Sequence, residues 1–355
     1  MIDILNDILP YISGLYTLPW IFIGFVLTLI LAKITDREKI DSIMKKIGFV
    51  LLYFFIPILS FRIFLNTSFG DKEIEFAIVV SIIVFFMYLL AFLYARFKAK
   101  SWGLSDSKKR LFIKTVLTNQ GRSSAFIGGA LLASPWYVEA AIYIALVGVA
   151  LFAVIPYILS YMHKKEVKDS KKNEQISALP WYLKLYPWYL LAFVISAVVI
   201  HATTGITTKN FGNDLETLVI FYSAITIPAA LYYVGSGIHP SDLKKSELKK
   251  LLGFDKNVET GDHWSWVRTI FIITVIITPI LTTFIFTPIF VFGFISSAWF
   301  AVITINSFLP ITSTNMFLLP YGIDKRSTAH SITWSTIVCV PIIVILITVF
   351  GIYLG

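Results

Sequence analysis

The stretch 117–132, which reads LTNQGRSSAFIGGALL, lies within an apolar run long enough to cross a lipid bilayer. Its centre nevertheless carries six small or polar residues: Asn119, Gln120, Gly121, Arg122, Ser123 and Ser124. Because a charge in the hydrocarbon core costs about 2.5 kcal/mol or more, this segment must face protein or a water-filled cavity. Polar side chains around a glycine therefore predict a helix that is interrupted at mid-membrane, where many transporters hold their substrate.

The composition is typical of an integral membrane protein. Of the 355 residues, 57% are hydrophobic and 14% are charged, and the mean hydropathy is +0.79. So few charges cannot cover the surface of a soluble protein. The basic residues lie in short loops between apolar runs, so membrane topology rather than nucleic-acid binding explains the net charge of +9. Cys339 is the only cysteine, which excludes an intrachain disulfide and a thiolate metal cluster.

Ten apolar segments are long enough to cross a bilayer as helices. They are roughly residues 15–33, 47–66, 74–95, 111–132, 138–160, 181–201, 214–236, 265–286, 289–319 and 328–353. The 30 Lys and Arg residues lie in or beside the loops after the odd-numbered spans, except Arg62, Lys72, Arg122 and Lys209. By the positive-inside rule those loops face the cytoplasm. We therefore expect a multi-pass protein of the cell membrane, in contact with the lipid bilayer, with both termini outside the cytoplasm.

The chain divides into two halves of similar size. Residues 1–160 hold spans one to five, a polar cytoplasmic linker covers 161–180, and residues 181–355 hold spans six to ten. Because five is an odd number, the two copies must point in opposite directions across the membrane. Inverted repeats with a discontinuous helix in each half are typical of secondary transporters.

Three matched features support an internal repeat. Pro57 in the second span corresponds to Pro228 in the seventh, and Pro156 in the fifth corresponds to Pro341 in the tenth. The polar break of the fourth span is matched in the ninth by Thr304, Asn306, Ser307, Pro310, Thr312, Ser313, Thr314 and Asn315. The halves therefore share the positions of their helix-disturbing residues.

The length of the ninth span also indicates a break. A straight helix from Ile289 to Leu319 would be about 46 Å long, well beyond the hydrocarbon core. Pro310 removes one internal hydrogen bond and clashes with the preceding turn. We therefore expect the ninth span to unwind between Asn306 and Pro310.

Short motifs occur in a fixed order along the chain. They are the aromatic run 53–61 around Pro57, Asn119 with Gly121, Pro228 with Leu231 and Gly235, Pro310, the tetrad Tyr321-Gly322-Ile323-Asp324, and Thr336 with Pro341. This set resembles the auxin efflux carrier family, within the larger group that includes bile acid–sodium symporters. One departure is Ala130, which stands where that family usually has a proline.

The resemblance implies an all-α polytopic fold, a five-plus-five inverted repeat of ten transmembrane helices. Spans one, two, six and seven would form a scaffold, and spans three to five with eight to ten would form a moving transport unit. The fourth and ninth helices would unwind and cross, with the substrate beside the crossing. Substrates of that family are typically small organic anions.

The polar residues of the two breaks have two interpretations. Arg122 either binds a substrate carboxylate bidentately or holds backbone carbonyls at the crossing. The uncharged residues either bind substrate or satisfy backbone groups freed by the breaks. These residues are Asn119, Gln120, Ser123, Ser124, Asn306, Thr312, Thr314 and Asn315. We expect Gly121 and Pro310 to make the breaks, and Pro57 and Pro228 to shape the facing scaffold helices.

These features predict a secondary active transporter of a small organic anion such as a carboxylate, working by alternating access. The alternatives are a sodium-coupled symporter of the bile-acid type and an ion channel. An enzyme is not expected, because no His, Asp, Glu and Cys residues converge within the spans. No cofactor or metal is expected. The coupling ion, sodium or proton, and the oligomeric state, monomer or homodimer, are left open by the sequence.

Overall fold

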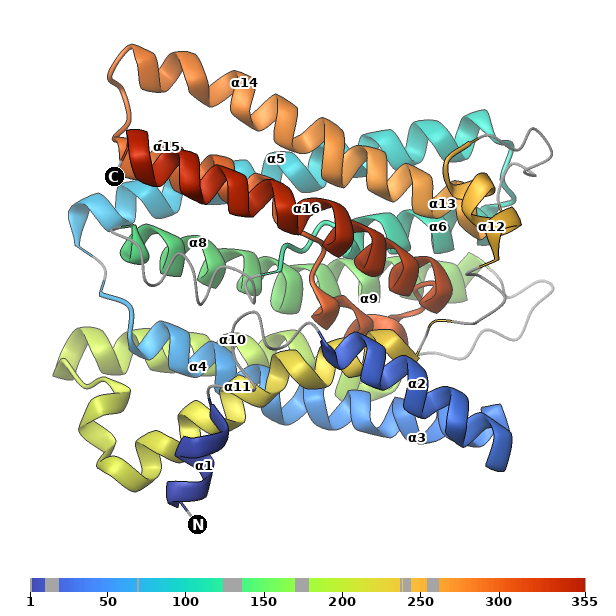
Figure 1. Ribbon diagram of the computed structural model, residues 1–355, viewed down its shortest axis with the longest axis horizontal. Helices are drawn as coiled ribbons and strands as arrows, with labels where there is room; N and C mark the ends of the chain where they lie inside the picture. Colours follow the sequence, from blue (N-terminus) through green and yellow to red (C-terminus); the bar gives the residue numbers. More distant parts are fainter. Residues whose placement is uncertain are drawn as a thin grey trace.

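The computed structural model describes residues 2–9, 19–68, 70–123, 136–169, 179–236, 238, 244–253 and 262–354. Within these ranges every regular element is a helix (Figure 1). Seven of the helices in this part of the chain are long and apolar enough to cross a membrane, and Pro19–Ile34 is a shorter apolar helix. The described part of the chain is therefore all-helical, and its apolar helices fit the multi-pass membrane protein that the composition predicts.

The first half holds these helices: α1 Ile2–Ile8, α2 Pro19–Ile34, α3 Arg37–Val50, the π-helix η3 Leu51–Phe55, α4 Ile56–Leu65, α5 Asp71–Ser101, α6 Asp106–Thr118, α8 Tyr137–Val149, the π-helix η4 Ala150–Val154 and α9 Ile155–Asp169. The second half holds α10 Trp181–Thr204, the 3₁₀-helix η6 Thr208–Phe211, α11 Asn213–Ser236, α12 Lys245–Leu251, α13 His263–Phe271, the π-helix η8 Ile272–Ile277, α14 Thr278–Val291, α15 Ser297–Ser307, the 3₁₀-helix η9 Ser313–Tyr321 and α16 Lys325–Tyr353.

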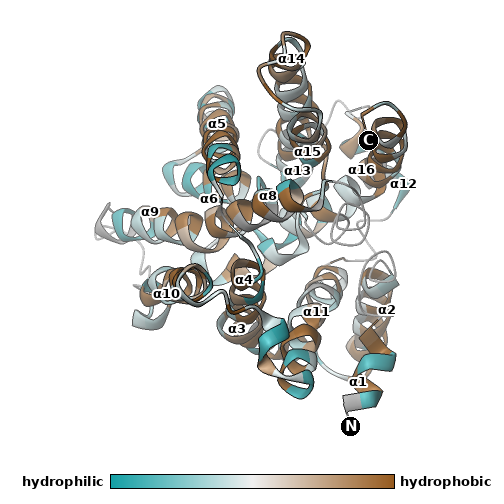
Figure 2. Ribbon diagram, turned by 90° about the vertical axis from the view of Figure 1, so that its left-hand side faces the viewer, coloured by the Kyte–Doolittle hydropathy of each residue, from teal (hydrophilic) through white to brown (hydrophobic). Residues whose placement is uncertain are grey.

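The helices pack in two groups. In the first group, α2 packs on α11, and α4 packs on α10 and α11. In the second group, α5 packs on α6 and α8, α14 packs on α15, and α13 packs on α16. The first group lies in the lower part and the second in the upper part of both Figures 1 and 2. Large apolar side chains such as Phe22, Phe85 and Phe284 are exposed, as expected where helices face lipid.

The ninth predicted span begins later than the sequence indicates. Its first residues, Ile289 to Val291, belong to the end of α14. Gly293 then has a positive φ of 77°, and the hydroxyl of Ser296 caps α15 by accepting a hydrogen bond from the Trp299 N–H. The predicted start at Ile289 was wrong because the apolar turn between the two helices has the hydropathy of a helix. The interruption near Pro310 is nevertheless present, since α15 ends at Ser307.

Each described π-helix directly precedes a proline at the second position of the next helix: η3 precedes Pro57, η4 precedes Pro156 and η8 precedes Pro279. A proline lacks an N–H and its ring clashes with the carbonyl four residues earlier, so a wider turn relieves the clash. Pro228 and Pro341 lie instead within α11 and α16. The proline pairs that match in the sequence therefore differ in local backbone geometry.

Glycines allow α2 and α11 to approach closely. A Cβ atom on Gly24 would overlap the Tyr232 carbonyl oxygen, and one on Gly235 would overlap the Ile21 carbonyl oxygen. Small residues at such contacts are the usual way for membrane helices to gain van der Waals packing. Both glycines are therefore required by the contact between these helices rather than by backbone conformation.

We expect Gly235→Ala to lower the thermal unfolding midpoint by several degrees, because the new methyl group meets a main-chain atom and overpacking costs about 1–3 kcal/mol. Unfolding of the detergent-purified protein measures this. The matched control is Gly351→Ala in α16, where a Cβ atom meets nothing within 4 Å. Equal midpoints for the two variants would contradict this account of the α2–α11 contact.

Candidate functional site at the crossing of two unwound segments

The first unwound segment follows α6, which ends at Thr118. The side-chain amide of Asn119 donates to the Thr115 carbonyl at 2.8 Å, and that of Gln120 donates to the Val116 carbonyl at 3.0 Å. The Thr115 carbonyl also accepts from the Asn119 N–H, whereas the last carbonyls of a helix commonly lack such partners, so the Gln120 amide supplies a donor at the helix end. Asn119 and Gln120 therefore follow the end of the helix and donate hydrogen bonds to carbonyls of its last turn.

The second unwound segment follows α15 and has a similar end. The Asn306 side-chain amide donates to the Val302 carbonyl at 2.8 Å. Pro310 has no N–H to continue the helix. The chain resumes as η9 at Ser313, and the Thr312 hydroxyl accepts a hydrogen bond from the Thr314 N–H.

The two unwound segments pair with each other. The Ser123 N–H donates to the Pro310 carbonyl at 2.8 Å, and the Thr312 N–H donates to the Gly121 carbonyl at 2.9 Å. Arg122 and Ile311 thereby form an antiparallel bridge. Each segment supplies partners for backbone groups that the other exposes by leaving its helix.

Neighbouring helices hold the crossing in place. Asn119 also donates to the Thr328 hydroxyl at 3.1 Å, and Gln120 donates to the Thr274 hydroxyl at 2.9 Å. The Ile311 N–H donates to the Ser335 hydroxyl at 3.1 Å. These bonds tie the crossing to α16 at Thr328 and Ser335 and to η8 at Thr274.

Arg122 is 3% exposed and lies against this crossing. One terminal nitrogen of its guanidinium donates to the Leu309 carbonyl at 3.2 Å, and the other donates to the Thr274 carbonyl at 2.7 Å. Its buried Nε has no hydrogen-bond partner among the described residues. The carbonyl contacts agree with the structural interpretation of Arg122, and its role as a substrate ligand stays a prediction.

A small cavity of about 50 Å³ lies between the crossing and α4. Five of the predicted binding residues line it: Arg122, Ser123, Asn306, Thr312 and Thr314. The opposite wall includes Leu59, Ser60, Ile63 and Phe64 of α4. This volume holds a few water molecules. The cavity therefore gathers polar residues from both breaks against one helix of the first packing group.

The other predicted residues have different places. Asn119, Gln120 and Asn315 are buried but do not line this cavity. Pro57 is buried in α4 shortly before the lining residues, and Pro228 is buried in α11, which packs on η9. The rest of the predicted fourth span, with Ser124, lies outside the described residues.

Comparison with known proteins places the chain in a family. The family model described as Conserved hypothetical protein 698 matches residues 63–253, more than half of the chain. The chain belongs to this family. The match includes α6 and the first unwound segment of the crossing, but it ends before α15. A search of curated proteins gave no match. The family description names no substrate, so the function of this member has to be argued from its own residues.

Sequence reasoning missed Thr274, Thr328 and Ser335, which hold the crossing. One available signal was the spacing of Ser327, Ser331 and Ser335, four residues apart and all buried on α16. Residues at this spacing share a helix face. A polar stripe on an otherwise apolar span indicates contact with polar protein groups rather than lipid.

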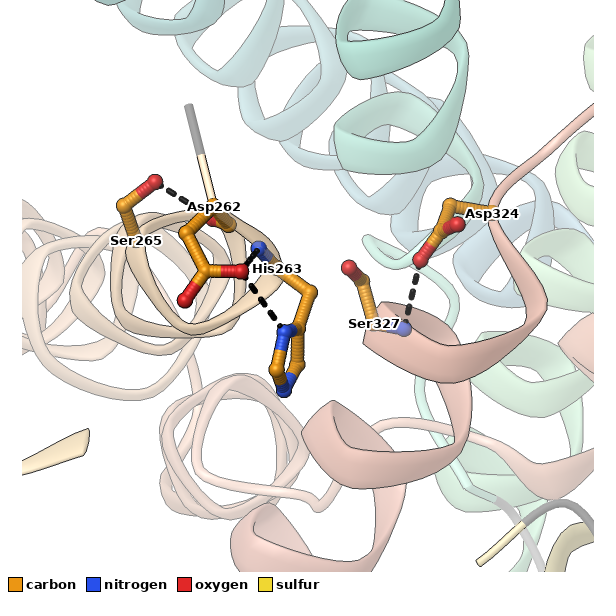
Figure 3. Close-up of polar contacts among 5 residues, drawn as sticks. All are labelled: Asp262, His263, Ser265, Asp324 and Ser327. Atoms are coloured by element: carbon orange, nitrogen blue, oxygen red, sulfur yellow. Dashed lines mark hydrogen bonds and ion pairs between the residues drawn. The ribbon is translucent and has the colours of Figure 1, made fainter. Parts of the chain in front are cut away.

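Two aspartates cap the helices that flank the site (Figure 3). Asp262 accepts hydrogen bonds from the His263 N–H at 2.7 Å and pairs with its ring nitrogen at 2.9 Å. Asp324 accepts from the Ser327 N–H at 2.7 Å, and the Asp324 N–H donates to the Thr115 hydroxyl on α6 at 2.9 Å. The Asp324 of the Tyr-Gly-Ile-Asp tetrad therefore starts α16 and ties it to α6.

The contacts given for these residues are those of helix capping. The Ser265 hydroxyl donates to the main-chain carbonyl of Asp262 at 2.6 Å rather than to His263. A nucleophilic serine needs a base within hydrogen-bond reach of its hydroxyl. The contacts drawn in Figure 3 are accounted for by helix capping.

We expect Gly121→Ala to disturb the crossing, because a Cβ atom there would lie 2.8 Å from the Asn315 side-chain oxygen and 2.9 Å from a Leu151 methyl group. The thermal unfolding midpoint should fall by several degrees. The control is Gly148→Ala, which lies in the wall of the same cavity and whose Cβ atom meets nothing within 4 Å. If Gly121→Ala were as stable as Gly148→Ala, close approach at Gly121 would not be required.

Proposed function

We propose that the chain is a secondary active transporter that carries a small organic anion, such as a carboxylate, across the cell membrane by alternating access. The observation that supports this most is the pairing of residues 121–123 with 310–312 beside a cavity that polar residues of both breaks line. Irregular backbone at membrane depth is tolerated where it is buried in protein or lines a water-filled cavity. Transporters commonly build substrate sites from such interrupted helices.

We further propose the ten-helix inverted repeat that the resemblance to auxin efflux carriers implies. The long helices, the shorter helix α2 and the two interrupted segments supply enough elements for ten spans. The group with α2, α4, α10 and α11 would be the scaffold, and the other group the transport unit. The cavity supports this division, since α4 forms one wall and the crossing forms another. With the Lys- and Arg-rich loops on the cytoplasmic side, both termini would lie outside the cytoplasm.

Arg122, the one charged residue among the described residues of the cavity wall, and a helix N-terminus beside it favour an anionic substrate. Arg122 has donor groups beyond the two that its carbonyl contacts use. Thr312, the N-cap of η9, and Ser313 and Thr314, the first two residues of η9, also line the cavity. The N-terminal end of a helix carries partial positive charge and exposed N–H groups, which attract carboxylates. A carboxylate in the cavity would thus meet a guanidinium and a helix N-terminus.

Sodium coupling is a second candidate, favoured by the other helix ends. The side-chain oxygens of Asn119, Gln120 and Asn306 are buried without a hydrogen-bond partner among the described residues. They lie at the C-terminal ends of α6 and α15, where the helix dipole is negative. Neutral oxygen ligands at such ends are how some transporters hold a sodium ion. A symporter would then bind the anion at the N-terminal end of η9 and the sodium ion at the C-terminal ends of α6 and α15.

We expect Ser60→Leu to lower uptake of the transported carboxylate into proteoliposomes at least about ten-fold. The leucine fills a cavity of about 50 Å³ without changing any residue of the crossing. The control is Ser196→Leu, at an exposed serine of α10. Unchanged uptake by Ser60→Leu would remove the cavity from the transport route, and conductance that does not saturate with substrate would indicate a channel.

Arg122→Lys should separate the two roles of the arginine. Lysine keeps the charge but cannot donate from two planar terminal nitrogens at once. A substrate role predicts a raised KM for the carboxylate whether or not the midpoint falls, whereas a purely structural role predicts a lower midpoint with the KM unchanged. Before the KM can be measured, the ligand class has to be identified. Thermal unfolding in the presence of mono- and dicarboxylates, indole acids and bile acids, each with and without sodium, identifies it.

A further inference from the structure

A second and much larger cavity lies away from the crossing. Its volume is about 800 Å³, and α5, α6, α8, η4 and α9 contribute its walls. Most of its lining is apolar, with residues such as Val84, Leu89 and Ile158. The residues at one end are charged: Asp106, Lys109, Arg110 and Lys165. The cavity is therefore amphipathic, with an apolar body and a basic end.

This cavity opens toward the lipid-facing side of the helices. Among its lining residues, Phe85 is 67% exposed and Tyr161 is 66% exposed. Val154 of η4 is half exposed. Exposed apolar side chains on membrane helices face lipid, so a molecule can enter the cavity sideways from the bilayer.

The length of the cavity matches one leaflet of the membrane. Its residues on α5 extend from Ser81 to Phe92, which is about 16 Å along a helix. Half of a hydrocarbon core about 30 Å thick is about 15 Å. An acyl chain that starts at the basic end would thus reach the far end of the cavity near mid-membrane.

The charge at the basic end selects the head group. Three basic residues and one aspartate lie there, at the start of α6 and near the end of α9. By the positive-inside rule this end faces the cytoplasm. Basic pockets between membrane helices on that side bind the head groups of anionic lipids. A zwitterionic lipid carries no net negative charge to complement Lys109 and Lys165 at this end.

We infer that this cavity binds an anionic phospholipid, with an acyl chain along α5 and α9 and the phosphate beside Lys109 and Lys165. The site does not depend on the proposed transport function. It lies on the side of α6 that carries Lys109, Ile113 and Leu117, and Leu117 is the last residue but one of that helix. A bound lipid therefore braces the helix that leads directly into the crossing.

The test is lipid retention and stability of the full-length protein with Lys109→Gln and Lys165→Gln combined. In wild type, phosphatidylglycerol should be retained over phosphatidylcholine in native mass spectrometry and should raise the unfolding midpoint more. Each lysine near anionic lipid contributes about 1 kcal/mol, so removal of both charges should lower the preference for phosphatidylglycerol about thirty-fold. The matched control, Lys33→Gln with Lys46→Gln, changes two exposed lysines outside the cavity. This control should keep the preference for phosphatidylglycerol over phosphatidylcholine.

Two further experiments distinguish lipid binding in this cavity from general attraction of anions to a basic surface. Glycerol 3-phosphate, which lacks an acyl chain, should not raise the midpoint. Ala150→Trp, which fills the apolar body of the cavity, should reduce retention of phosphatidylglycerol. Equal lipid preference in the two double variants, or stabilisation by glycerol 3-phosphate alone, would overturn the inference.

Discussion

The pairing of two unwound backbones is the constraint on which the rest of the structure depends. A chain that leaves its helix inside a membrane exposes N–H and C=O groups that lipid cannot satisfy. Here residues 121–123 and 310–312 supply partners to each other. The amides of Asn119, Gln120 and Asn306 close the helix ends on either side. Because each break depends on the other, neither segment could be irregular alone.

Arg122 combines contacts that stabilise the crossing with a position in the cavity of the proposed substrate. The α6 and α15 helices both direct their negative C-terminal ends at the crossing. A buried guanidinium that donates to two carbonyls balances this charge, and it also lies in the wall of the cavity. A substrate anion would therefore compete for the group that helps to stabilise the empty site. Such competition is one physical route by which binding could be coupled to movement of the crossing.

The surroundings of the crossing differ in how tightly they are packed. On the α2–α11 side, glycines bring helix backbones into contact. Across the crossing, only a cavity of about 50 Å³ separates it from α4. Behind α6, by contrast, about 800 Å³ is left open toward the lipid. A membrane protein can leave such a space open because acyl chains fill apolar grooves as side chains do.

The sequence by itself determined the class of the protein and where its helices are interrupted. Hydropathy is a local property, so the apolar spans were predictable, and polar residues beside Gly121 and Pro310 are costly in lipid unless the helix opens there. The same local signal could not separate the end of α14 from the start of α15, because the turn between them is apolar. Which polar residues line the cavity was also not predictable. Only tertiary structure decided that Asn119 and Gln120 face α16 and η8 while Ser123 and Thr312 face α4, since that choice depends on helices distant in the chain.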